Sequence, residues 1–183
     1  MSNPMLAPEV SASVTGRVPK YLYTARATKV KAQQEKAPKG YMRTVLACEI
    51  CAPDVVEDVS SPDKPKYAVA GRKFSLYLPT DPVSKQYSDS YAAFTNLGYK
   101  NPDGSINLEK FWQDAEAGTL FFYVELNSSE DVVKDGAGQP ILHPLTGQRI
   151  TKGWQIDFVQ PNNILGRADT GSPTAGGTTA APY

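Results

Sequence analysis

The segment Thr119–Leu126 (TLFFYVEL) constrains the fold of this chain more than any other stretch of the sequence. Its even-numbered positions are all apolar, whereas its odd-numbered positions include the charged Glu125. An alternation with a period of two is typical of a β-strand that buries one face. Phe121 and Tyr123 fall on the same face as Glu125, so we expect both rings to be either exposed or covered by a helix.

Strand signals also dominate the segments before and after this one. Extended structure is expected at Lys20–Gln33, Tyr41–Cys51, Gly71–Leu78 and Trp154–Val159. Two central segments instead carry apolar residues at helical spacing, and each has a glycine at or just after its end. These expected helices are Asp89–Gly98 and Asn107–Ala117.

Glycine and proline are frequent between Asn127 and Gly153, and they separate two short β-compatible runs. We expect a small hairpin there, in which Ile141–His143 pairs with Gln148–Thr151. The polar segment Asp54–Lys66 contains two prolines and is expected to be a surface loop.

The order of these elements is strands, then helices, then strands, which predicts a mainly β (α+β) fold. It fits a five-stranded Greek-key barrel with a short helical segment between strands 3 and 4 and an extra hairpin between strands 4 and 5. Some β-sandwiches share this order. We expect the barrel domain to span residues 18–166, between a flexible arm at 1–17 and a disordered tail at 167–183, because the tail is mostly Gly, Ala, Thr and Pro.

Charge is distributed unevenly along a chain that has 19 basic and 19 acidic residues and therefore no net charge. From residue 17 to residue 43 a single acid, Glu35, accompanies eight basic residues: Arg17, Lys20, Arg26, Lys29, Lys31, Lys36, Lys39 and Arg43. From residue 49 to residue 63 there are five acids and no base. Such asymmetry is typical of a protein with a polyanionic partner, although a solvated strand face can also produce it.

Signatures of catalysis and of metal binding are absent from the sequence. His143 is the only histidine, and there is no nucleophile elbow, P-loop or dinucleotide-binding glycine motif. Cys48 and Cys51 have the spacing of zinc ligands, but zinc needs four ligands and no other cysteine is present. Glu125 and Asp157 could meet as an acid–base pair, but such carboxylates more often mark a solvated sheet face. We therefore expect neither an enzyme nor a bound cofactor or metal.

Membrane and export signals are also missing. No stretch approaches the roughly 18 apolar residues that a membrane span needs. The first residues lack the basic flank and the apolar run of a secretion signal. The sequence therefore favours a cytoplasmic protein without membrane association.

The order of several short motifs resembles the OB-fold single-stranded DNA-binding proteins of tailed bacteriophages, over about Tyr21 to Leu165. The motifs are Glu49-Ile50 before Pro53, Ala70-Gly71-Arg72-Lys73 at the start of the third strand, Leu97-Gly98 and Leu108–Gly118 in the helical segment, Leu120–Leu126 in the aromatic strand, and Trp154, Ile156 and Phe158 in the closing strand. The resemblance implies an OB-like barrel. It also implies a function in the cytoplasm of a bacterial host, where the protein would protect single strands during phage DNA replication or recombination.

The end of the chain departs from that family's pattern. Many single-strand binders end in an acidic tail whose terminal hydrophobic residue recruits replication proteins. This chain ends in Ala181-Pro182-Tyr183, and Asp169 is the one acid of its last stretch. The resemblance implies that the tail recruits phage replication or recombination proteins. The acidic run that accompanies this role in the family is missing from this tail. The sequence leaves the oligomeric state open, with a homo-oligomer as one alternative.

Binding of single-stranded DNA needs basic side chains along the phosphates and flat rings against the bases. The expected phosphate contacts are Lys20, Arg26, Lys29, Lys31 and Arg43 on the first two strands, Arg72 and Lys73 on the third, and Lys134, Arg149 and Lys152 in the late hairpin. The expected stacking rings are Tyr21, Tyr23, Tyr41, Tyr77, Phe121 and Tyr123. Trp154 shares its strand face with Ile156 and Phe158 and is expected in the core, as is Trp112.

The alternative function is that of a virion structural or decoration protein built on a small β-barrel. Such proteins also combine alternating strands, Pro-rich loops and tails of Gly, Thr and Ala. The basic, tyrosine-bearing first third of this chain favours DNA binding, because a virion protein does not need a groove of one sign.

Overall fold

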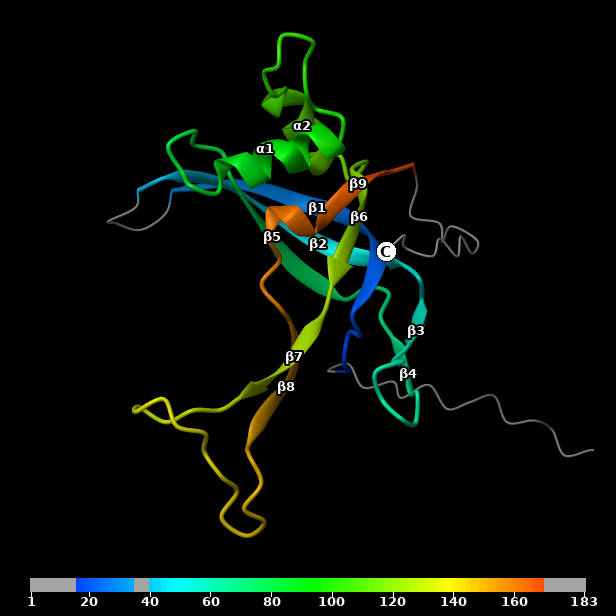
Figure 1. The fold of residues 1–183 in the computed structure, drawn as a ribbon, viewed down its shortest axis with the longest axis vertical. Coiled ribbons are helices and arrows are strands. Elements are labelled where there is room, and N and C mark those ends of the chain that lie inside the picture. The colour runs from blue at the N-terminus through cyan, green and yellow to red at the C-terminus, as the bar shows by residue number, and fades with distance from the viewer. Residues whose placement is uncertain (1–15, 35–39, 170–183) are drawn as a thin grey trace, which may run out of the picture.

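The computed structural model describes residues 16–34 and 40–169, which form a mainly β structure with two short α-helices (Figure 1). The strands are β1 Tyr21–Gln34, β2 Met42–Ala52, β3 Val55–Glu57, β4 Lys66–Ala68, β5 Lys73–Pro79, β6 Phe121–Leu126, β7 Ser128–Val132, β8 Thr151–Ile156 and β9 Ile164–Ala168. The helices are α1 Tyr87–Asn96 and α2 Leu108–Glu116, and a 3-10 turn, η1, spans Pro161–Asn163. Most of the expected N-terminal arm (1–15) and of the expected tail (170–183) lies outside the described residues, as do Lys36 and Lys39.

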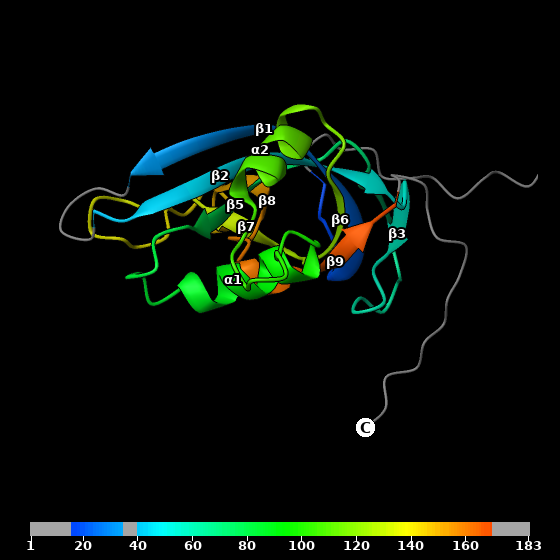
Figure 2. The same cartoon turned by 90° about the horizontal axis from the view of Figure 1, so that it is seen from above.

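The main sheet contains five strands in the order β5-β2-β1-β6-β9, and all neighbouring pairs are antiparallel. β1 is its central strand and pairs with β2 along most of its length, but with β6 only from Tyr21 to Arg26. The register of β1 against β2 shifts between Thr24 and Ala25 and again between Ala27 and Lys29. Irregularities of this kind bend a strand and increase its twist. Figure 2 shows the resulting curl of the sheet, with α1 on its open side.

The described residues do not close into the expected barrel. The edge strands β5 and β9 share no ladder, and a single parallel bridge, between Leu76 and Val159, links β5 to the segment that precedes β9. α1 contacts both edge strands. The helical segment therefore lies between the two edges that would have to pair, and it replaces their hydrogen-bonded contact with side-chain packing.

The core lies between the inner face of the main sheet and the two helices. Tyr23 of β1 and Phe122 of β6 are completely buried, and the rings of Phe94 and Phe111 meet edge to face with their centroids 4.9 Å apart. Burying a large apolar side chain stabilises a fold by roughly 1.5–3 kcal/mol. In β6 the even-numbered positions are buried and the odd-numbered ones are not, so the predicted alternation is confirmed.

Both predicted helices are present. α1 begins slightly earlier than expected, and α2 begins after Asn107, whose side-chain oxygen accepts a hydrogen bond from the Lys110 N–H at 3.0 Å. This contact satisfies one of the free N–H groups of the first helical turn. Gly118 follows α2 with a φ of 68°, a left-handed conformation that favours glycine and ends a helix.

The closing strand differs from the sequence prediction. β8 ends at Ile156 and pairs with β7 outside the main sheet, so the predicted strand Trp154–Val159 is wrong as a member of that sheet. The fifth strand is β9, which directly follows η1. Within this turn the Gln160 N–H donates to the Asn163 side-chain oxygen at 2.8 Å. Pro161 therefore occupies a single short turn, and extended structure begins again at Ile164. Because β9 runs to Ala168, the sheet extends beyond the expected boundary at residue 166.

Residues 128–156, which we call the arm, project from the body on the side away from α1 and α2 (Figure 1). β7 and β8 form the base of the arm. The hairpin expected farther along the arm is confirmed by the bridge between Leu142 and Arg149 and by the His143 N–H, which donates to the Gln148 carbonyl at 2.7 Å. The segment Asp54–Lys66, expected to be a loop, includes β3 and begins β4, which pair as a short hairpin.

Two arginines fix the base of the arm. Arg17 forms an ion pair of 2.5 Å with the buried Asp58, and its guanidinium lies 5.2 Å from the ring centre of Trp154. Arg72 donates to the carbonyl of Gly16 and, at 3.3 Å, to that of Trp154. Gly16 and Arg17 therefore belong to the folded unit, although the sequence assigns them to the flexible N-terminal segment 1–17. Trp154 is half-buried at this junction rather than in the main core.

Asp114 connects α2 with β9. Its carboxylate accepts hydrogen bonds from the Tyr99 hydroxyl at 2.7 Å, from Arg167 Nη2 at 3.2 Å and from Lys110 Nζ at 3.3 Å. Burial raises the pKa of Asp114, but the hydrogen bonds from Tyr99, Lys110 and Arg167 outweigh it, so the pKa lies below the ordinary value. Folding therefore favours the charged form of this carboxyl.

We expect Asp114→Asn to lower the free energy of unfolding by about 1 kcal/mol at pH 7. A carboxyl whose pKa is lowered by folding stabilises the fold above its unfolded-state pKa, and this stability is lost as the pH falls through the folded-state pKa. The deficit of the variant should therefore shrink below about pH 4. Urea unfolding at pH 7 and pH 3 measures both effects. Glu116→Gln, at an exposed position of α2, is the control, and a deficit that persists undiminished at pH 3 would contradict the assignment.

Candidate nucleic-acid interface

The outer face of the main sheet, turned away from the core, carries basic residues in cross-strand rows. Lys29 of β1 lies beside Ala47 of β2, which lies beside Ser75 of β5. The next row contains Lys31, Val45 and Tyr77. We define the basic face by five residues of these three strands: Lys29, Lys31, Arg43, Lys73 and Tyr77. They occupy the positions that alternate with the buried residues of the same strands.

A shallow groove crosses this face. One part, of about 570 Å³, is bordered by β1, β2 and β5 and includes Arg26, Lys29 and Lys73. A second part, of about 350 Å³, lies between β5 and residues 155–158. Both parts are lined by Lys73 and Ser75, so they adjoin across β5. The groove therefore leads from Lys29 of β1 to the base of the arm.

An aromatic stack lies at the end of the groove nearest the arm. The rings of Tyr77 and Phe158 are stacked, with centroids 5.0 Å apart and planes inclined by 17°. The Arg43 guanidinium lies 4.7 Å from the ring centre of Tyr77, and 59% of Phe158 is exposed. Phe158 is thus an exposed ring stacked on a tyrosine that has a cation beside it, and a planar base can stack on such a ring.

The position of Phe158 corrects the sequence interpretation, which assigns it to the core with Trp154 and Ile156. β8 ends at Ile156, and Asp157 N–H donates to the Asn127 carbonyl at 3.0 Å. Beyond this point the period-two alternation no longer holds, so Phe158 faces solvent and Val159 is buried. Sequence reasoning misses Phe158 because the end of the strand depends on its pairing with β7.

The charge of the basic face is only partly neutralised. Lys29, Lys31 and Lys73 are exposed and take part in none of the ion pairs formed between described residues. Arg26, by contrast, pairs with Glu49, and its guanidinium lies 5.9 Å from the ring centre of Phe121. The lysines are thus available to an anionic partner, whereas Arg26 already has a carboxylate beside it.

Tyr23 cannot stack on a base in this structure, because it is completely buried in the core. Its hydroxyl donates to the Pro19 carbonyl at 2.7 Å, and burial raises its pKa well above the ordinary value. Tyr21, two residues earlier, is 49% exposed and touches Tyr23 edge to face. Lys20 forms an ion pair of 3.3 Å with Glu125. Because β1 begins at Tyr21, Lys20 and Tyr21 lie at the opposite end of this strand from Lys29 and Lys31.

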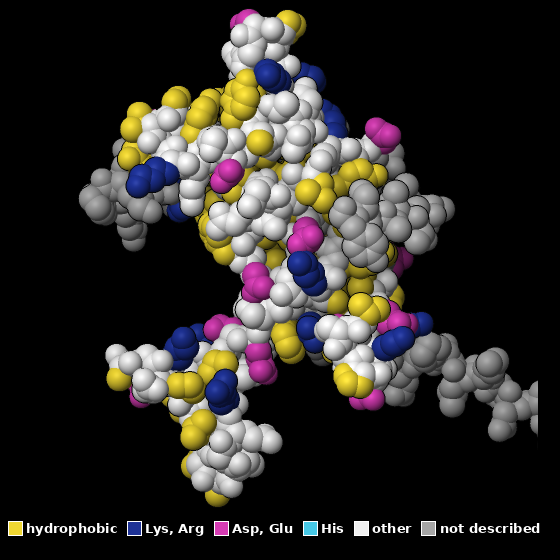
Figure 3. All heavy atoms as spheres, viewed as in Figure 1, with side chains coloured by type: hydrophobic (Ala, Val, Ile, Leu, Met, Phe, Trp, Pro, Cys, Tyr) yellow, Lys and Arg dark blue, Asp and Glu magenta, His cyan; other side chains and the backbone are white. Residues whose placement is uncertain are grey.

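The remaining predicted residues fall into three groups. Arg72 is half-buried, burial lowers its pKa, and its hydrogen bonds to Gly16 and Trp154 make it a structural residue. Half-buried rings outside the stack are Tyr41, Phe121 and Tyr123. Exposed basic residues of the arm are Lys134, Arg149 and Lys152. Figure 3 shows a hollow between the arm and the body, with basic side chains on the arm.

Other chemistry has little support in the described residues. No group of three or more His, Cys, Asp or Glu there could hold a metal ion, and neither helix is long and apolar enough to cross a membrane. Cys48 is buried and Cys51 half-buried, both as free thiols, and burial raises the pKa of each. Asp157 accepts hydrogen bonds from Asn127 and Ser129, while Glu125 pairs with Lys20.

Comparisons with protein-family models, with curated proteins and with solved structures found no match to this chain. The function must therefore be inferred from the arrangement of the side chains.

We expect Tyr23→Phe to lower the free energy of unfolding by about 1 kcal/mol, because it leaves the Pro19 carbonyl without its buried donor. Tyr21→Phe, which removes an exposed hydroxyl, is the matched control and should leave stability unchanged. Urea unfolding monitored by circular dichroism measures both variants. Equal stability of the two variants would show that the Tyr23 hydroxyl makes no net contribution.

Proposed function

We propose that this protein binds single-stranded DNA on the basic face and protects single strands during phage DNA replication or recombination. One observation carries the proposal: a single groove joins Lys29 and Lys73 to the stack of Arg43, Tyr77 and Phe158. Cations along a groove and exposed rings at its end are the two components that sequence-independent binding of single strands requires.

An OB-like fold is part of the same proposal. OB folds are partly open five-stranded Greek-key barrels that bind oligonucleotides on strands 2 and 3 and on the loops that join strands 1–2 and 4–5. Numbered along the chain, the main sheet has the order 3-2-1-4-5, and the bridge between Leu76 and Val159 brings the segment that precedes strand 5 beside strand 3. In this numbering strands 2 and 3 are β2 and β5, and the arm belongs to the connection between strands 4 and 5. The groove lies on β1, β2 and β5 and reaches the base of the arm, which supports the proposal.

The proposed binding mode combines contacts to phosphates with stacking on a base. Lys29, Lys31 and Lys73 would contact phosphates, and a base would stack on Phe158 at the free side of the pair with Tyr77. The basic residues of the arm would approach the strand from the side of the hollow that the arm forms (Figure 3). No step of this function requires a catalytic group or a cofactor.

A virion structural protein is the competing function, and the exposed leucines of the arm favour it, because exposed apolar side chains suit assembly contacts. It predicts no affinity for DNA that depends on the lysines of the groove. The two functions are therefore separated by the binding experiments below.

We expect a fluorescently labelled oligo-dT to bind the purified full chain more tightly than a duplex of equal length. Affinity should fall steeply with salt, because each neutralised phosphate of a single strand contributes roughly −0.7 to the slope of log K against log salt. Fluorescence anisotropy at several salt concentrations measures this slope. Absence of binding at low salt would exclude the proposed function.

We expect Phe158→Ala and Tyr77→Ala each to weaken oligo-dT binding by roughly 1–3 kcal/mol, the usual contribution of a stacked base. Lys73→Ala should weaken binding and reduce the magnitude of the salt slope by roughly 0.7, the contribution of one phosphate contact. Tyr87→Ala and Lys85→Ala, at the start of α1 and just before it, are the matched controls. Equal binding by the groove variants and the controls would place any DNA site elsewhere.

A further inference from the structure

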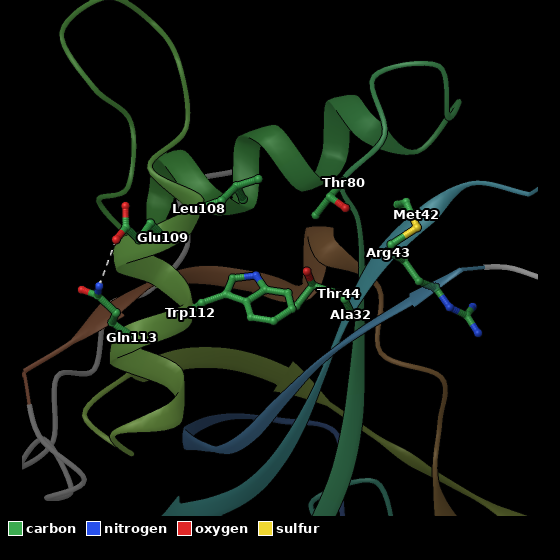
Figure 4. A pocket seen from close by; sticks show the side chains of 9 residues that line it. All are labelled: Ala32, Met42, Arg43, Thr44, Thr80, Leu108, Glu109, Trp112 and Gln113. Atoms are coloured by element: carbon green, nitrogen blue, oxygen red, sulfur yellow. Dashed lines mark hydrogen bonds between the residues drawn. The ribbon is translucent and has the colours of Figure 1, made fainter.

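A second hollow lies on the inner side of the sheet, between α2 and the ends of β1 and β2, and it is mostly apolar (Figure 4). We call it the apolar groove; its lining residues are Ala32, Met42, Arg43, Thr44, Thr80, Leu108, Glu109, Trp112 and Gln113. Its volume is about 500 Å³, within the range of cavities that hold a ligand or a few side chains. In Figure 4 the Trp112 ring points from α2 into the hollow, whereas Arg43 points away from it.

The apolar groove is open in the described structure. Met42 is 42% exposed and Leu108 37% exposed, although both are large apolar residues. Apart from Arg43, which reaches over Tyr77 on the outer face, the charged residue of the lining is Glu109. The groove is thus an apolar surface with a carboxylate at its edge, and it suits a partner that is apolar and carries a positive charge.

The tip of the arm has this composition. Ile141, Leu142 and Leu145 are 38%, 55% and 90% exposed, and none of them belongs to the core. Between residues 136 and 151 the sequence contains no acid, and its one fully charged residue is Arg149. Exposed apolar side chains gathered on a projecting hairpin are typical of a surface that contacts a partner.

We propose that the tip of the arm docks in the apolar groove of a second copy of this chain. The leucines of the tip would contact Met42, Leu108 and Trp112, and Arg149 would approach Glu109. The arm projects on the side away from α2 (Figure 1), so the groove of the same molecule is not the partner in this conformation. The proposal does not rest on DNA binding, because both surfaces exist without a strand.

The two surfaces are different, so the contact is heterologous. Such contacts either continue from copy to copy or close into a ring, and two copies can also exchange arms reciprocally. In every case each contact needs one intact tip and one intact groove. This requirement allows a test by mixing two variants.

The test uses the full chain without DNA, in sedimentation velocity over a range of protein concentrations. The wild-type protein should self-associate. Leu145→Asp changes a 90% exposed tip residue, and Leu108→Glu places an acid in the first turn of α2, where helices favour it, so both variants should fold. Each variant alone should associate at least about tenfold more weakly than wild type. A mixture of the two should form a 1:1 complex and no larger species, because it offers one intact tip and one intact groove.

The matched control is Leu165→Asp, because Leu165 of β9 is 57% exposed and lies outside both surfaces. It should associate like the wild type. Reversing the charges singly, by Arg149→Glu or Glu109→Arg, should weaken association, and the double variant should recover it. A wild-type protein that stays monomeric at all concentrations would overturn the proposal, as would association that Leu108→Glu leaves intact.

Discussion

The fold depends on the two-sided pairing of β1. Within the main sheet, β1 is the one strand whose ladders connect the pair β5–β2 to the pair β6–β9, because β5 and β9 share no ladder. Each neighbouring strand contributes backbone hydrogen bonds and buried side chains, so a change that removed β1 would separate the sheet into two pairs. The register shifts within β1 bend the strand and bring both pairs around one core.

The same pairing organises the outer surface. Because side chains alternate along a strand, the buried residues Val30, Leu46 and Leu76 alternate with residues that face solvent. Cross-strand neighbours then place lysines of β1 in rows with residues of β2 and β5. The basic face and the core are thus the two faces of the same sheet. A register slip of one residue in a strand would move its buried side chains to the outer face and its outer side chains to the core.

Local patterns in the sequence predicted much of the fold. The alternation in β6, the helix expected at Asn107–Ala117 and the hairpin around Leu142 and Arg149 depend on near neighbours, and all three are present. Features that depend on distant partners were missed or misassigned. Phe158 is exposed because β8 pairs with β7, Arg17 is fixed by Asp58, and β9 continues the sheet after a proline turn. The same limit applies to the candidate site: the exposed lysines, Arg43 and Tyr77 were predicted as site residues, but Phe158, which completes the stack, was assigned to the core.

The zero net charge of a chain with a basic face affects how copies tolerate one another. A uniformly basic protein repels its own copies when they lie close together, and this repulsion acts over a Debye length of about 8 Å at physiological salt. Here 19 acids balance 19 bases, so the long-range repulsion between copies largely cancels, while the lysines still act locally on an anion in contact with them. The spacing of neighbouring copies along a charged polymer would then be set by the shapes of the copies rather than by repulsion between their charges.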